Sequence, residues 1–201
     1  MSIFSSNEQD VYIAAPIPAR IQKASKVLII TDDKVQDLEF FYPYYRLSEE
    51  GYSVDVATLD GGEFEGKHGM GLKDSIPVED VNPDDYALLY LPGGKAPESL
   101  RKNERVLEIV RNFYSNNKLI ASICHGAQIL ISAGVIVGKQ VAAWPEIKDE
   151  VQQSGAYFID EALVEDGQFI TARQPGDLHR HLSGVMDYLK GRKEQTQRRA
   201  S

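Results

Sequence analysis

The sequence predicts one α/β domain in which helices cover both faces of a mostly parallel sheet. Short apolar runs of strand length alternate along the chain with stretches of helical periodicity. The chain has 201 residues, which fits one domain and is long enough to bury a sizeable core. No internal repeat and no second domain are visible, so these runs are expected to build a single sheet.

Composition narrows the classes of partner. The formal net charge is −8, which disfavours nucleic acid and anionic membranes as general partners. No apolar stretch approaches the ~20 residues that a membrane span requires. The N-terminus has no apolar signal core, and a single cysteine excludes an internal disulfide. We therefore expect a protein of the reducing cytoplasm.

The two ends differ from the middle of the chain. Residues 1–25 are polar at first and then carry Pro16 and Pro18, so we expect an arm that is extended or disordered. The alternative is a strap across a neighbouring subunit. Residues 26–190 form the predicted domain, and residues 191–201 form a basic polar tail that is expected to fray.

The first half of the domain begins with a βαβ unit. Strands are expected at 26–31 and 53–58, joined by a right-handed crossover through a helix over 37–50. Gly51 is expected to end this helix. The residues assigned to its core-facing side are Leu38, Phe41, Tyr42, Tyr45 and Leu47. A small β-hairpin is expected in the glycine-rich stretch 59–82.

The remaining elements follow in alternation. A buried strand over 87–91 runs into Pro92-Gly93-Gly94, and helical spacing then begins at Pro97 and continues over 106–114. The later predicted elements are a strand at 119–123, a helix ending near Gly134, a strand at 140–144, a helix at 146–153, a hairpin of 162–165 and 168–172, and a helix over 177–189.

The only cysteine, Cys124, lies where the strand over 119–123 meets the following helix. This strand–Cys–helix junction is typical of a nucleophile elbow. Unpaired backbone N–H groups and the helix dipole at such a turn favour a thiolate. The alternative is an inert buried thiol.

Three predicted strands end in groups that could do chemistry. They are followed by residues 32–39, by Pro92-Gly93-Gly94 and by Cys124-His125. Ligands of open α/β sheets bind outside the carboxyl ends of the strands. We therefore expect these three segments to form one site.

The motifs resemble the ThiJ/PfpI superfamily, and most closely its PfpI-like branch. The matching stretches are 26–31, Asp37-Leu38-Glu39, Tyr42-Pro43-Tyr44, Gly66-Lys67-His68-Gly69, Leu91 to Glu98, Ser122 to Gln128, and Arg173 to Leu178. The resemblance implies a flavodoxin-like three-layer sandwich with a nucleophilic cysteine. Members are described as intracellular proteases, as glyoxalases that need no glutathione (glyoxalase III), as protein deglycases and as stress proteins.

The resemblance also implies roles for single residues. Cys124 matches the nucleophile and His125 the histidine beside it, whose backbone N–H would form an oxyanion site with the N–H of Gly94. Glu39 matches a carboxyl that contacts the thiol. Glu98 matches the acid that completes a Cys-His-Glu triad from a neighbouring subunit. The alternatives are a packing role for His125 and helix-terminal roles for Glu39 and Glu98.

Two positions depart from this pattern. Gln36 stands where the branch usually has a second acid, and an amide cannot transfer a proton. Trp144 stands where the branch often has tyrosine, so the substrate pocket is expected to be narrower. We assign Gly93, Gly94, Gln36 and Trp144 to the oxyanion or substrate-binding part of the site.

No metal and no cofactor are expected. His68 has no acid at ligand spacing, and His179 and His181 do not share a helix face. Gly-x-Gly-x-x-Gly and Gly-x-Ser-x-Gly motifs are absent, and His179-Arg180-His181 lacks the His-x-Glu of an amidotransferase.

Three functions remain open. The first is a cysteine-dependent glyoxalase or deglycase-like enzyme that acts on small reactive carbonyls or their protein adducts. The second is a peptidase that uses the same residues on a peptide. The third is a redox-sensing or chaperone-like stress protein in which Cys124 oxidises without turnover. The expected partner is a second copy of the chain, in a dimer or a hexamer.

Overall fold

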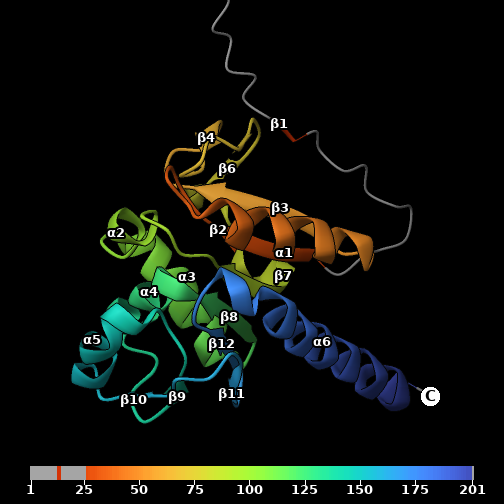
Figure 1. Ribbon diagram of the computed structural model, residues 1–201. Coiled ribbons are helices and arrows are strands. Elements are labelled where there is room, and N and C mark those ends of the chain that lie inside the picture. Colours follow the sequence, from red (N-terminus) through yellow and green to blue (C-terminus); the bar gives the residue numbers. More distant parts are fainter. Residues whose placement is uncertain (1–12, 15–25, 201) are drawn as a thin grey trace, which may run out of the picture.

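The computed structural model describes residues 13–14 and 26–200. Its centre is a seven-stranded sheet in the order β11-β12-β8-β7-β2-β3-β6 (Figure 1). Every pairing in it is parallel except that of β11 with β12. The strands are β2 (Lys26–Ile30), β3 (Ser53–Thr58), β6 (Ile76–Pro77), β7 (Tyr86–Leu91), β8 (Leu119–Ile123), β11 (Val164–Asp166) and β12 (Phe169–Ala172).

Helices form the layers on either side of this sheet. The helices are α1 (Asp37–Glu49), α2 (Pro97–Leu100), α3 (Glu104–Ser115), α4 (Ala127–Ala133), α5 (Lys148–Gln153) and α6 (Leu178–Ala200). α1 packs beside α6, and α3 packs beside α4 (Figure 1). The predicted α/β class is therefore confirmed. None of the helices over residues 26–200 combines the length and the apolar composition needed to cross a bilayer.

The four middle strands lie in the core because their side chains are apolar on both faces. In β8 all five residues are buried, and in β2 only Lys26 is exposed. Tyr90 of β7 is fully buried and meets His181 of α6. The predicted strands over 26–31, 53–58, 87–91 and 119–123 are confirmed.

The predicted core side of α1 is wrong in part. Leu38, Tyr42 and Tyr45 are 56%, 40% and 36% exposed, whereas Phe41 and Leu47 are buried as expected. Phe40, Tyr44 and Pro43 fill the buried side in their place. Apolar residues surround this helix on several sides, so periodicity alone does not fix which of them meets the sheet.

Shorter elements differ from their predicted bounds. The expected strand at 140–144 is only β9 (Gln140–Val141), which pairs with β10 (Tyr157–Phe158) outside the main sheet. The helix expected from Pro97 onward is divided into α2 and α3, because the Asn103 side chain caps α3 by accepting from the Val106 N–H. α6 continues to Ala200 and so includes residues assigned to the tail.

The expected glycine-rich hairpin is present as β4 (Phe64–Glu65) and β5 (Gly71–Leu72), paired antiparallel. A short strand β1 (Ile13–Ala14) pairs with β5. The rest of the predicted arm, residues 1–12 and 15–25, lies outside the described residues.

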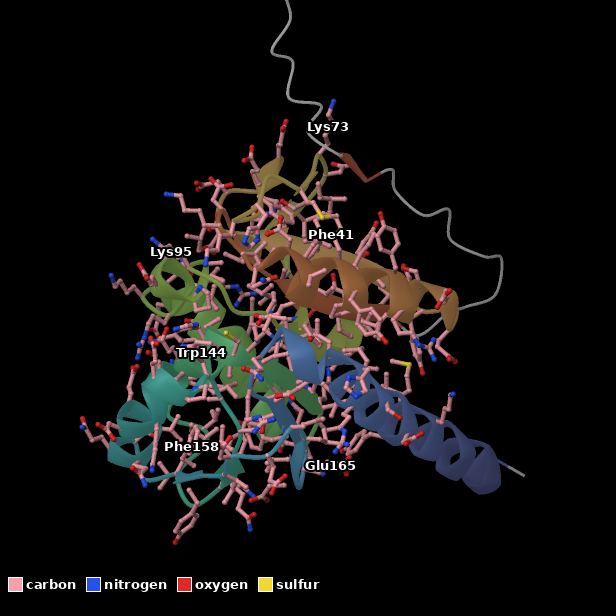
Figure 2. The ribbon with its side chains drawn as sticks, in the orientation of Figure 1. Phe41, Lys73, Lys95, Trp144, Phe158 and Glu165 are labelled. Atoms are coloured by element: carbon pink, nitrogen blue, oxygen red, sulfur yellow. The ribbon has the colours of Figure 1, made fainter. Side chains whose placement is uncertain are left out.

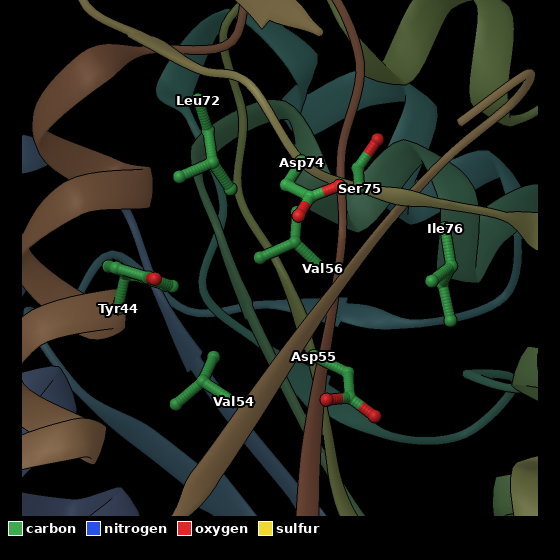
Figure 3. Close-up of a pocket in the computed structure, with 8 residues that line it drawn as sticks. All are labelled: Tyr44, Val54, Asp55, Val56, Leu72, Asp74, Ser75 and Ile76. Atoms are coloured by element: carbon green, nitrogen blue, oxygen red, sulfur yellow. The ribbon is translucent and has the colours of Figure 1, made fainter. Parts of the chain in front are cut away.

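A hollow lies beside this hairpin at the edge of the sheet. Its volume is about 230 Å³, and its lining comes from α1, β3 and the segment 72–76. Figure 3 shows Val54 and Val56 on one side of β3 and Asp55 on the other. We call it the edge cavity.

Candidate active site

Cys124 opens the 3-10 turn Cys124–Gly126, which joins β8 to α4. Its φ is 59°, in the left-handed region that residues other than glycine rarely adopt. Such a backbone costs of order 1 kcal/mol or more and persists only where the surroundings enforce it. Gly126 allows the turn to press against β7, because a Cβ there would overlap the Leu91 carbonyl oxygen. The chain at this position therefore has the strained turn expected of an elbow.

The order of the strands brings the three expected segments together. β8, β7 and β2 are neighbours in the sheet, so their carboxyl ends share one edge. A cavity of about 400 Å³ lies there, which we call the thiol cavity. Its lining residues are Gln36, Glu39, Lys67, Gly94, Lys95, Glu98, Cys124, His125, Trp144, Glu146 and Pro175.

Glu39 is fully buried on the first turn of α1 and lies against the Cys124 thiol. Its Oε2 accepts from the Gly93 N–H at 2.8 Å, and its Oε1 has no hydrogen-bond partner among the described residues. Burial raises the pKa of Glu39 to about 7, against the opposing effects of the Gly93 N–H and the thiol. This carboxyl can therefore both hold and release a proton near neutral pH.

The thiol itself departs from the expectation of a free thiolate. Burial, and next the negative charge of Glu39, raise the pKa of Cys124 to about 12, although the N–H groups of His125 and Gly94 lower it. The turn N–H groups act as expected, but Cys124 is buried, and the desolvation of its thiol outweighs them. Protonation of Glu39 removes the charge that opposes the thiolate, so the two groups titrate as a pair.

The His125 ring also contacts the sulfur. Its Nδ1 is 3.3 Å from Sγ, and its ring is 6.2 Å from the Trp144 ring, centroid to centroid. Burial lowers the pKa of His125, against the charges of Glu146 and Glu98. The imidazole is therefore neutral at pH 7 and able to accept a proton from the thiol.

Gln36, Gly94 and Trp144 also line the cavity, and Gly93 contacts Glu39. Gln36 caps α1, with Oε1 accepting from the Leu38 N–H at 2.7 Å, and Trp144 donates its backbone N–H to the Cys124 carbonyl at 3.3 Å. A Cβ on Gly93 would lie 2.7 Å from Glu39 Oε2 and 2.8 Å from Cys124 Cβ. Only glycine therefore lets these two side chains meet.

Glu98 is exposed on α2 and lines the thiol cavity of its own chain. No hydrogen bond joins it to His125 in the part of the chain that is described. Its charge does act on the ring, since it raises the pKa of His125. The structure thus places Glu98 near the site without showing a triad.

Sequence reasoning missed several residues of this site. Lys67, Lys95, Glu146 and Pro175 line the cavity. Three of them lie in or beside the motif stretches, but nothing in their residue types indicated that they face the thiol. Asp37 was missed as well: it is buried and accepts from His68 and Met70, so it holds the loop that carries Lys67.

Two of the three histidines outside the site, His68 and His181, have structural partners. His68 was expected to lack an acid, but its Nδ1 lies 2.9 Å from Asp37 Oδ2, because the fold brings two distant segments together. His181 is fully buried and His179 is exposed, so they do not share a face. Within residues 13–14 and 26–200, no group of three His, Cys, Asp or Glu residues could hold a metal ion.

The chain is similar to proteins of one known family. A family model described as the DJ-1/PfpI family matches residues 25–187. A protein of Pyrococcus abyssi named as a deglycase is 44% identical over 165 residues, which cover 82% of this chain and 99% of that protein.

Solved structures share the fold. A two-domain protein of Anabaena variabilis, with DJ-1/ThiJ/PfpI-like and ferritin-like domains, has a TM-score of 0.81 and 32% identity, with 83% of this chain and 48% of that chain covered. Drosophila melanogaster DJ-1beta has a TM-score of 0.77 and 25% identity over 83% of this chain and 90% of that chain. The matched stretch contains the whole sheet and every residue assigned to the site, and this chain therefore belongs to the DJ-1/PfpI family.

Proposed function

We propose that this protein is a cysteine-dependent enzyme that acts on small reactive carbonyls or their protein adducts, in the manner of a glutathione-independent glyoxalase or a deglycase. The observation that supports this most is the pair of Cys124 and Glu39. A thiol beside a buried carboxyl with a pKa of about 7 has a proton acceptor and donor in contact with the nucleophile. The deglycase name of the Pyrococcus abyssi relative agrees with this chemistry.

The first step adds sulfur to a carbonyl carbon. The C–S bond forms, the thiol proton passes to Glu39 or His125, and the carbonyl oxygen takes a proton from the protonated Glu39 to give a hemithioacetal. The N–H groups of His125 and Gly94 already contact the sulfur, so they are placed to stabilise negative charge on an adjoining oxygen.

With a 2-oxoaldehyde, two further steps complete the turnover. A base, Glu39 or His125, removes the proton on the sulfur-bearing carbon and returns it to the neighbouring carbon, which gives a thioester. Water then hydrolyses the thioester, releasing a 2-hydroxy acid and the thiol. The sum is addition of one water to the oxoaldehyde, so no external oxidant or reductant is required.

The test compares wild type with Cys124→Ala on methylglyoxal, with lactate measured by NMR. We expect lactate from wild type and a loss of roughly a thousandfold or more in the variant, as for removal of a nucleophile. Equal rates in the two proteins would refute the proposal.

The same pair of proteins distinguishes the alternatives. Cleavage of unfolded protein that depends on Cys124 would instead establish a peptidase. Without turnover of either substrate, stable addition of two oxygens to Cys124 by mild peroxide would favour a redox sensor.

We also propose that the protein forms a homo-oligomer in which Glu98 of a neighbour supports His125. The test mixes Cys124→Ala and Glu98→Ala subunits after dissociation and reassembly. If Glu98 acts across subunits, mixed oligomers regain activity that neither variant has alone. If each chain uses its own Glu98, mixing restores nothing, which would reject the trans arrangement.

A further inference from the structure

A second cavity adjoins the thiol cavity. It has a volume of about 410 Å³ and is lined by Asp33, Lys34, Glu65, Gly66, Lys67 and Lys95. Lys67 and Lys95 line both cavities, so they form the wall that the two share. A substrate held at Cys124 therefore has these two lysine residues in the wall beside it, with further space behind them.

Backbone bonds fix the positions of these lysines. The Lys67 N–H donates to the Val35 carbonyl at 2.8 Å, and the Lys95 N–H donates to the Lys34 carbonyl at 2.9 Å. Asp37, which is buried, holds the turn after Lys67 by accepting from the N–H groups of His68 and Met70 at 2.9 and 3.1 Å. The two loops are thus tied to the segment just before α1 and to its first turn, which carries Glu39.

The ammonium groups of these lysines have no ionic partner within the described part of the chain. Lys34, Lys67 and Lys95 form no ion pair there, whereas Lys26, Lys118 and Lys139 each do. The charge of Lys67 reaches the site, since it lowers the pKa of His125.

Acidic groups lie close by and limit the kind of anion that fits. Glu98 and Glu146 line the thiol cavity, and Asp33 and Glu65 line the second cavity. Asp33 is partly occupied, because its Oδ1 accepts from the Glu65 N–H at 2.9 Å. These acids repel a dianion more strongly than a monoanion, so a carboxylate suits the site better than a phosphate.

We propose that Lys67 and Lys95 form a carboxylate subsite beside Cys124, so that the preferred substrates are reactive carbonyl compounds that carry a carboxylate. The subsite rests on the proposed function for its biological meaning, because it deepens the choice of substrate at the same thiol. The attraction of the two lysines for a carboxylate does not depend on turnover, so it is tested separately.

The test uses two alkylating agents that differ in one group. Iodoacetate carries a carboxylate and iodoacetamide a neutral amide, and the chain has one cysteine, so all alkylation reports on Cys124. The rate ratio of iodoacetate to iodoacetamide, measured by mass spectrometry, cancels changes in thiol pKa and access. We expect Lys67→Gln/Lys95→Gln to lower this ratio by roughly threefold to tenfold, the size expected for two charges within several Å.

Lys73→Gln is the matched control. Lys73 is exposed on the glycine-rich hairpin and lines neither cavity, and it lies far from Lys95 and Trp144 (Figure 2). It removes one positive charge, against two in the double variant, and should leave the ratio within about 1.5-fold, because exposed charges beyond the screening length act weakly.

A ratio unchanged in the double variant, or lowered equally by Lys73→Gln, would overturn the subsite. Failure of the proposed function is a different result: Cys124→Ala would then turn over methylglyoxal as fast as wild type, whatever the alkylation ratio. A wild-type ratio that falls toward that of the double variant as salt is added would further support the subsite.

Discussion

The thiol cavity and the edge cavity are both hollows beside the same sheet, yet they differ in the state of their polar groups. In the edge cavity, Asp55 accepts from the Tyr86 hydroxyl at 2.9 Å and pairs with Lys26 at 3.1 Å. In the thiol cavity, Glu39 is more deeply buried and one of its oxygens has no partner among the described residues. A carboxylate whose oxygens have hydrogen-bond or ionic partners stabilises the fold. A buried carboxyl that lacks such a partner at one oxygen has a shifted pKa, and this allows it to take part in proton transfer.

The two cavities also differ in their place in the sheet. The thiol cavity lies at the carboxyl ends of three adjacent strands, where loops from distant parts of the chain meet. The edge cavity lies beside the edge strand β6 and its neighbour β3, with aliphatic walls from Val54, Val56 and Leu72 (Figure 3). Reactivity therefore follows from convergence of strand ends, and a hollow alone does not indicate a site.

The largest contrast should be in activity. Cys124→Ala is expected to lower kcat/KM for methylglyoxal by roughly a thousandfold or more, because it removes the nucleophile. Asp74→Ala, in the edge cavity, should change it less than about twofold, since surface substitutions usually have small effects. If steady-state assays gave comparable losses of kcat/KM for the two variants, activity would not distinguish the thiol cavity from the edge cavity.

Removing the carboxyl group of Glu39 and removing that of Asp55 should change the unfolding free energy in opposite directions. The pKa of Glu39 in the folded chain, about 7, lies above its ordinary value of 4.5, so the folded state holds its proton more tightly. Its contribution to stability is complete below pH 4.5 and is lost as the pH rises through 7. Glu39→Gln should therefore raise the unfolding free energy at pH 8 by about 3 kcal/mol, with a gain that vanishes near pH 4.5.

Asp55→Asn should instead destabilise by about 1 kcal/mol, because it weakens a partly exposed pair. Urea titrations at pH 5 and pH 8 measure both variants. A Glu39→Gln protein that is no more stable at pH 8 than wild type would contradict the shifted pKa.

Enlarging one side chain beside each cavity should have different effects on stability. Gly93→Ala places a methyl group between Glu39 and Cys124, with contacts of 2.7 and 2.8 Å, and should cost about 2–3 kcal/mol of stability together with most of the activity. Val54→Ile extends into the edge cavity and should stay within about 0.5 kcal/mol. Thermal unfolding of both variants gives the comparison, and equal losses would argue against a tightly packed thiol site.

The hydrogen bond between Tyr86 and Asp55 should matter for stability and not for turnover. Tyr86→Phe removes the hydroxyl that donates to Asp55 and should lower the unfolding free energy by about 1 kcal/mol. Methylglyoxal turnover should be unchanged. A change in turnover with no change in stability would link the edge cavity to the active site.

Much of the fold followed from local pattern. The apolar runs over 26–31, 87–91 and 119–123 are strands because, apart from Lys26, nearly all their side chains suit a site buried on both faces. The side of α1 that meets the sheet did not follow from pattern, since Leu38 and Phe40 are equally apolar and only packing against β2 and β3 selects between them. The predicted length of short strands such as β9 was too long, because the strand that pairs with β9 is distant in sequence.

Some features of the site were likewise determined by the sequence, and others only by the tertiary structure. The sequence by itself determined the candidate nucleophile, its turn and the strand ends that accompany it, because these depend on residue type and spacing within short stretches. Only the tertiary structure decided the protonation of Cys124 and Glu39 and the presence of Lys67 and Lys95 beside them. Desolvation and charge act through space, and the groups responsible lie on segments that only the folded sheet brings together.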